Sequence, residues 1–192
     1  VAGGDIEGAN DFINRGADPN TNAHSGTTPC PIHLAVLHGS VDMVQMLLNR
    51  GATPDTPDNS SHYQPVFYAI KRKVQGHLRA LIEAGANVNA RQRHFGKLPL
   101  EVALDEKHFE SALTLAKSGN IDPRERCHRG ITVLGYACEV RQEEIMKALI
   151  LDCNADVNED TGLGGLPIHI GLTVQVYRPV SKDCLLLLLS CG

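Results

Sequence analysis

Two short basic segments, 34 residues apart, hold the side chains of this chain that could bind a ligand. Guanidinium groups form paired hydrogen bonds with carboxylates and phosphates, and lysine and protonated histidine add positive charge. The first segment carries Arg91, Arg93, His94 and Lys97, and the second carries Arg124, Arg126, His128 and Arg129, with Glu125 among them. The two segments together favour a partner with an acidic or phosphorylated segment.

Other interpretations of these segments remain open. Loop tips are polar in most proteins, so the cations could simply be solvated. Nucleic acid is disfavoured as the partner, because the net charge is −4 and aromatic residues make up only 4% of the chain. Lys71 and Arg72, at the end of a predicted helix, form a second candidate binding position.

The sequence shows no residue combination that supports catalysis or metal binding. The sequence has no HExxH motif and no Ser-His-Asp arrangement that spacing supports. Cys127, His128 and His94 supply three ligands, whereas a structural zinc site takes four. The glycines of GLGG at 162–165 lack the strand and helix that flank a phosphate-binding loop, so we expect a turn there. We therefore expect no enzyme activity, cofactor or metal.

Cysteine usage and hydropathy indicate a location in the cytoplasm or nucleus. The six cysteines stand at positions 30, 127, 138, 153, 184 and 191, and none forms a CxxC pair. We expect buried, reduced thiols, with a disulfide framework or a zinc site as the alternative. The leucine run 185–189 is far shorter than the roughly 20 apolar residues of a membrane span. It therefore predicts an unusually apolar helix that needs a covering neighbour.

The basic segments recur because the chain itself repeats every 34 residues. An apolar helix start recurs at Pro31, Pro65, Pro99, Val133 and Pro167, and a closing glycine recurs at Gly51, Gly85 and Gly119. Asn154 takes the place of the next closing glycine. Proline suits the first turn of a helix, and glycine suits the left-handed residue after its end. A fixed period of this length predicts short helix pairs stacked on one another.

These units resemble the ankyrin repeat in PIHLA with LLNRGA, in PVFYA with LIEAGANVNA, and in PIHIG near the end. The resemblance implies an all-α solenoid of stacked helix–turn–helix units with β-hairpin finger loops. We expect one array over residues 1–192, with a partial repeat at 1–28 and repeats at about 29–62, 63–96, 97–130, 131–165 and 166–192. The last repeat is predicted to have a longer loop between its helices, containing Pro179.

The resemblance also implies the function of a scaffold or adaptor. Finger loops and first helices would form a concave surface that binds a protein partner. The alternative is a regulatory or targeting segment of a larger enzyme, channel or ubiquitin-ligase adaptor. Asn89 matches the turn asparagine that a cytosolic hydroxylase modifies in this family, with Leu81 eight residues earlier, although a purely structural role for Asn89 is the competing interpretation.

Departures from the family pattern lead to expectations about stability. Of the residues that precede the first helices, only Thr132 keeps a capping hydroxyl. His33 and His169 are expected to bond to backbone, whereas Phe67, Glu101 and Gly135 replace this histidine elsewhere and leave the polar link between repeats incomplete. Because finger tips are exposed, replacing Arg93 and Arg126 by glutamate is expected to leave the melting temperature unchanged but to weaken the binding of the partner.

Overall fold

The computed structural model describes residues 5–21, 29–59, 61–162, 164–173 and 182–190. These residues form eleven short α-helices and no β-strand. Contacts between Cα atoms divide the chain into two compact units. The first unit comprises residues 1–87 with 92–94, and the second comprises residues 88–91 with 95–192.

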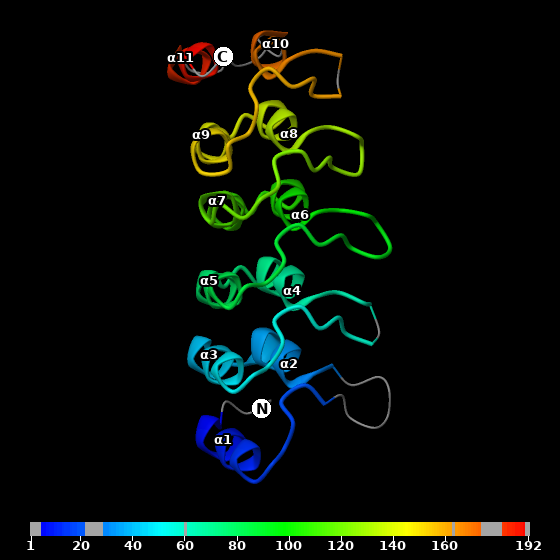
Figure 1. Ribbon diagram of the computed structural model, residues 1–192, viewed down its shortest axis with the longest axis vertical. Helices are drawn as coiled ribbons and strands as arrows, with labels where there is room; N and C mark the ends of the chain where they lie inside the picture. Colours follow the sequence, from blue (N-terminus) through cyan, green and yellow to red (C-terminus); the bar gives the residue numbers. More distant parts are fainter. Residues whose placement is uncertain (1–4, 22–28, 60, 163, 174–181, 191–192) are drawn as a thin grey trace. The chain divides into compact units, whose positions relative to one another are not determined.

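The first unit contains five helices in two rows. They are α1 (Ile6–Asn14), α2 (Pro31–His38), α3 (Val41–Asn49), α4 (Pro65–Arg72) and α5 (Gln75–Glu83). The first helices α2 and α4 pack on each other, and the second helix α3 packs between α1 and α5. Within each pair, α2 contacts α3 and α4 contacts α5. Each helix thus covers its partner and the neighbouring repeat (Figure 1).

The second unit continues the same pattern with six helices. They are α6 (Pro99–Asp105), α7 (Phe109–Lys117), α8 (Val133–Glu139), α9 (Glu143–Leu151), α10 (Pro167–Thr173) and α11 (Lys182–Ser190). First helix α8 packs on α6 and α10, and second helix α9 packs on α7 and α11. The predicted all-α repeat fold is confirmed, and all five predicted first-helix starts are the observed ones. The predicted long loop around Pro179 lies in residues 174–181, outside the described residues.

Small side chains allow the two rows of helices to approach closely. The fifth residue of four first helices is a fully buried alanine: Ala35, Ala69, Ala103 and Ala137. The seventh residue of the paired second helices is leucine, at positions 47, 81, 115 and 149, and none is more than 1% exposed. These alternating small and large residues interdigitate in the core of each repeat.

The left-handed residues after helix ends and the Thr132 helix cap predicted from the sequence are observed. Gly51, Gly85 and Gly119 have φ values of 88°, 85° and 70°, and Asn154 takes the same left-handed conformation at 56°. Thr132 Oγ1 accepts a hydrogen bond from the Gly135 amide at 3.1 Å and caps α8. Cys30, Gln64 and Leu98 make no such cap on α2, α4 and α6.

Finger loops project from the helix pairs, to the same side within each unit (Figure 1). Their hairpin character is strongest after α7, where Arg126 and Thr132 form an isolated antiparallel β-bridge. The described parts of the other fingers are built from turns. Gly162 and Gly164, on either side of a residue outside the described ones, both have φ of 82°.

Candidate partner-binding loops

Arg91 ties two successive fingers of the second unit together. Its Nη1 donates to the Gly96 carbonyl at 3.0 Å and so closes its own loop. Its Nη2 donates to the Arg126 carbonyl at 2.7 Å and forms an ion pair with Glu125. The Arg91 side chain is therefore committed to contacts within the protein.

Arg126 repeats this arrangement one finger later. Its Nη1 donates to the Gly130 carbonyl at 2.9 Å, and its Nη2 reaches the Asp160 carbonyl at 3.2 Å and Glu159 at 3.4 Å. Arg126 thus links its own loop to the following one. The premise that Arg126 is a free side chain on an exposed tip is therefore wrong, and we now expect its replacement to lower stability, because carbonyl groups would lose their donor.

Two more cations of the predicted basic surface are paired with carboxylates. Lys97 Nζ lies 2.6 Å from Asp105, and this hydrogen bond raises the pKa of Lys97. Arg129 forms an ion pair with Glu139 and lies over the Tyr136 ring, 5.4 Å from its centroid. Much of the positive charge that the sequence places on these loops is neutralised locally.

Glu101 provides the polar link that the sequence had seemed to lack. It occupies the position of His33 in its repeat and is 1% exposed. Its carboxylate accepts from the Leu98 amide at 3.4 Å and the His128 amide at 3.1 Å, and it also pairs with His128 Nδ1. The expected gap at this position is therefore wrong: Glu101 holds the finger that carries His128 against α6.

The histidines expected to be structural do bond to backbone. His33 is fully buried, and its Nε2 lies 3.1 Å from the Tyr63 carbonyl. His169 Nδ1 accepts from the Leu166 amide at 3.0 Å, within its own turn. The structural interpretation of both residues is confirmed.

Asp58 is a buried carboxylate that holds the loop between α3 and α4 in its conformation. It is 1% exposed and accepts from the Ser61 amide and hydroxyl, both at 2.6 Å, from the His62 amide at 2.9 Å, and from the Tyr68 hydroxyl. Burial by itself would raise the pKa of Asp58, but the hydrogen bonds outweigh it and lower the pKa to about 2. Asp58 is unavailable to a partner.

The tip of the first basic loop, unlike the paired cations of the two loops, is exposed to solvent. Arg93 and His94 are exposed, and the described residues offer them no ion pair. Phe95, next in the chain, is 61% exposed, and the turn is completed by Gly96 at φ 64°. Sequence reasoning missed Phe95. The pattern that could have indicated it is a large apolar residue that follows Arg93 and His94 and precedes a glycine. We call Arg93, His94 and Phe95 the loop tip.

The remaining candidate cations are also exposed. Arg124 lies on the second basic loop without an ion pair among the described residues. On α4, Lys71 Nζ lies over the Tyr63 ring, 4.7 Å from its centroid, and Arg72 is exposed at the helix end. Lys71 and Arg72 therefore remain candidates for contacts with a partner.

Asn89 bridges two finger turns in the second unit. Its Nδ2 donates to the Asn120 carbonyl at 2.8 Å, and its Oδ1 accepts from the Asp122 amide at 2.9 Å. Asn20 makes the same pair of bonds in the first unit, to the Gly51 carbonyl and from the Thr53 amide. These contacts give Asn89 a structural role, and its hydroxylation stays a prediction.

Cys30, Cys127, Cys138 and Cys153 are buried and are not in disulfides, as expected for reduced thiols. Burial raises the pKa of Cys127 to about 12, so that thiol is a poor nucleophile at neutral pH. Cys184 and Cys191 lie outside the side chains that the structure describes. Among the described residues there is no cluster of three or more metal-binding side chains, and no helix is long and apolar enough to cross a membrane.

Comparisons with known proteins point to one family. Residues 1–92 match a family model described as ankyrin repeats in three copies. The chain is 29% identical to Cyclin-dependent kinase 4 inhibitor B of Rattus norvegicus over 112 residues, which cover 58% of this chain and 83% of that protein. It is 33% identical to Tyrosine-protein kinase Shark of Drosophila melanogaster over 121 residues, covering 62% of this chain and 12% of the kinase. It is 36% identical to an ankyrin repeat protein of Rickettsia bellii over 90 residues, covering 46% of this chain and 35% of that protein.

Proposed function

Because residues 1–92 match ankyrin repeats, we propose that this chain is a protein-interaction module that acts as a scaffold or adaptor and has no catalytic activity of its own. The partner binds to finger loops and to first helices. The positive charge comes from exposed cations that have no ion pair among the described residues: Lys71 and Arg72 of α4, Arg93 of the first basic loop and Arg124 of the second. The partner segment is acidic or phosphorylated, since guanidinium groups pair well with both.

The observation that supports this proposal best is the loop tip. Neighbouring cations are held by Glu125, Asp105 and Glu139, whereas Arg93 and His94 are exposed beside an exposed phenylalanine. An aromatic ring at a loop tip contributes much apolar contact area for little loss of conformational entropy. The tip therefore fits an acidic segment that also carries an apolar side chain.

The test compares partner capture by wild type and by Arg93→Glu combined with Phe95→Ala. Immobilised wild-type protein captures partners for identification by mass spectrometry, and each purified partner is then titrated against both proteins. We expect the double variant to bind at least tenfold more weakly, and wild-type binding to fall as salt rises.

Two variants serve as matched controls. Arg79→Glu makes the same charge change on an exposed position of α5, and Phe12→Ala removes an equally exposed ring from α1. Neither is expected to affect the partner of the loop tip. Equal affinity of the wild type and the double variant would overturn the proposal and leave the α4 residues as the binding site.

One relative suggests a partner to include in these titrations. The rat protein is by its name an inhibitor of cyclin-dependent kinase 4, and this chain spans most of its length. That kinase is therefore a candidate partner. Its binding should weaken in the loop-tip variant if the same surface is used.

A second candidate function is favoured by the match to a tyrosine kinase, of which this chain spans only 12%. In that case the repeats are a regulatory or targeting segment of a larger enzyme, channel or ubiquitin-ligase adaptor. Sequencing the full-length transcript decides between the two functions. The location in the cytoplasm or nucleus and the single array over residues 1–192 stay predictions.

A further inference from the structure

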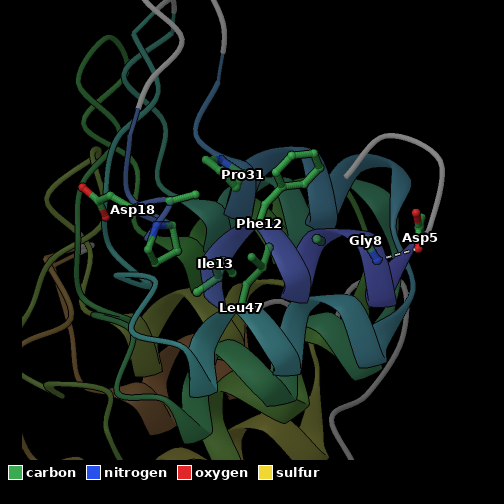
Figure 2. A pocket seen from close by; sticks show the side chains of 10 residues that line it. Asp5, Gly8, Phe12, Ile13, Asp18, Pro31 and Leu47 are labelled. Carbon is green, nitrogen blue, oxygen red and sulfur yellow. Dashed lines mark hydrogen bonds between the residues drawn. The ribbon is translucent and has the colours of Figure 1, made fainter. Parts of the chain in front are cut away.

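The first unit has two exposed surfaces of unlike chemistry. One is an open hollow of about 170 Å³ beside Leu47 and Phe12, which is 68% exposed (Figure 2). None of the described residues that line this hollow is a lysine, arginine or histidine, so it offers an anion no cationic partner. The other surface is the end of α4, where the consecutive residues Lys71, Arg72 and Lys73 are all exposed.

Lys73 ends α4 in a conformation that favours glycine. Its φ is 58°, and its amide donates to the Ile70 carbonyl at 3.0 Å in the turn that leads into α5. The same repeat position is left-handed at Lys107 and Arg141, with φ of 57° and 58°. A Cβ atom is unfavourable in this region, so these repeats carry a cation where glycine would fit with less strain. A strained residue of this kind indicates a role that glycine could not fill.

In the second unit, acidic residues accompany the cation at this position. Asp105 and Glu106 directly precede Lys107, and Glu139 lies two residues before Arg141. The helix dipole favours a cation at each of these helix ends. The corresponding run of α4 contains no acid, and none of its three cations has an ion pair among the described residues. The end of α4 therefore concentrates positive charge that the second unit balances.

Lys71 is held by an aromatic ring where the next repeat has an ion pair. Lys97 and Asp105 lie 2.6 Å apart, and the residues 34 positions before them are Tyr63 and Lys71. Lys71 Nζ lies 4.7 Å from the centroid of the Tyr63 ring. Tyr63 is itself buried, and its carbonyl lies 3.1 Å from Nε2 of the buried His33. The ring thus positions the ammonium group without neutralising its charge.

We propose that Lys71, Arg72 and Lys73, which we call the α4 cation site, bind a phosphorylated side chain of the partner protein. This inference rests on the proposed function and specifies the ligand of its α4 region. Because the three residues are consecutive, their Cα atoms lie within roughly 7 Å of one another, and their long side chains can reach one phosphate group. A phosphate carries about two negative charges and several acceptor oxygens, so it can pair with more than one cation, whereas a carboxylate carries a single charge.

The test follows backbone amide signals by NMR while a peptide is added to the protein at low salt. The peptide is Ala-Ala-phosphoserine-Ala-Ala with blocked ends, so its only charges are on the phosphate. We expect saturable shifts of the amide signals of residues 71–73, and weaker binding as salt rises. The same peptide with aspartate in place of phosphoserine should bind about tenfold more weakly, and the serine peptide should not bind.

Lys73→Gly separates the role of the cation from that of the turn. Glycine adopts positive φ readily, so this variant should keep the wild-type circular dichroism and should not lower the melting temperature. It should nevertheless bind the phosphopeptide at least about fivefold more weakly, because one of three cations is lost. Lys107→Gly makes the same change at the equivalent position of the second unit and should bind the phosphopeptide as wild type does.

Three results with the peptide would overturn the proposal. The first is the absence of saturable shifts in the wild type. The second is equal weakening by Lys73→Gly and Lys107→Gly, which would indicate general electrostatic attraction. The third is binding of inorganic phosphate as tight as that of the phosphopeptide, which would indicate an adventitious ion only.

The partner captured in the test of the proposed function gives a separate readout. We expect it to bind Lys73→Gly more weakly than wild type. If it binds Lys73→Gly as tightly as wild type, but binds the combined Arg93→Glu and Phe95→Ala variant more weakly, the α4 cation site is overturned while the proposed function stands.

Discussion

His33 on α2 and His77 on α5 are buried in the first unit, with exposed fractions of 0% and 3%. Burial lowers the pKa of both rings, and contacts with the backbone of Tyr63 and of Ser40, respectively, offset this only in part. Among the described residues, neither ring nitrogen of His77 has a hydrogen-bond partner in normal geometry. Both rings are therefore held neutral in the folded protein at pH values where the unfolded chain already binds protons.

This difference predicts that mild acid weakens the first unit. The free energy of unfolding is greatest above the ordinary histidine pKa of about 6.5. It falls as the pH drops below that value, by up to about 1.4 kcal/mol per pH unit for each ring. Urea unfolding at pH 7.5 and 5.5 measures the effect. His77→Leu should make stability less dependent on pH, whereas His38→Leu, at an exposed position of α2, should not. Equal stability of the wild type at both pH values would contradict this prediction.

At the scale of elements, arginines of the second unit hold successive fingers together. Arg91 and Arg126 each bond to a carbonyl of their own loop and to a carbonyl of the following one. Their ion pairs with Glu125 and Glu159 are partly exposed to solvent and contribute little by themselves. The carbonyl hydrogen bonds are therefore the main stabilising contribution of these side chains.

Arg93 and Arg126, which look equivalent in the sequence, should therefore respond differently to substitution. Arg126→Glu should cost about 1–2 kcal/mol, because two carbonyl groups lose a donor and a new carboxylate lies near Glu159. Arg93→Glu should change stability by no more than about 0.5 kcal/mol, since Arg93 is exposed. Urea unfolding at low and high salt measures both values. Equal free energies of unfolding for the wild type and both variants would show that the finger contacts are not stabilising in solution.

At the scale of the whole molecule, the leucine run of α11 is only partly covered. Leu188 is 4% exposed, but Leu186 and Leu189 are 50% and 63% exposed, and Leu172 of α10 is 42% exposed. Several exposed leucines on adjacent helices form the kind of apolar surface that promotes association. The covering neighbour expected from the sequence is absent from the described residues.

We therefore predict that the protein associates as its concentration rises. Light scattering should give a mass that increases with concentration for wild type and stays near 20.8 kDa for Leu186→Lys combined with Leu189→Lys. Leu151→Lys changes a similarly exposed leucine of α9 and should associate as wild type does. A concentration-independent monomer mass for wild type would contradict the prediction.

The sequence by itself determined the repeat, its period and the ends of its helices. Proline at a helix start and a left-handed glycine or asparagine after a helix end act through local backbone conformation, so Pro65, Gly85 and Asn154 could be interpreted correctly without knowledge of their neighbours. The apolar spacing within each pair likewise fixes which residues face inward.

Only the tertiary structure decided which polar side chains are available to a partner. Arg91 and Arg93 look alike in the sequence, but Arg91 meets Glu125, 34 residues away, while Arg93 is exposed. Glu101 and Asp58 likewise look like surface acids until stacking and loop closure bury them. Such pairings depend on distances across neighbouring fingers and helices, which local propensity does not encode, and the same is true of the uncovered ring of Phe12.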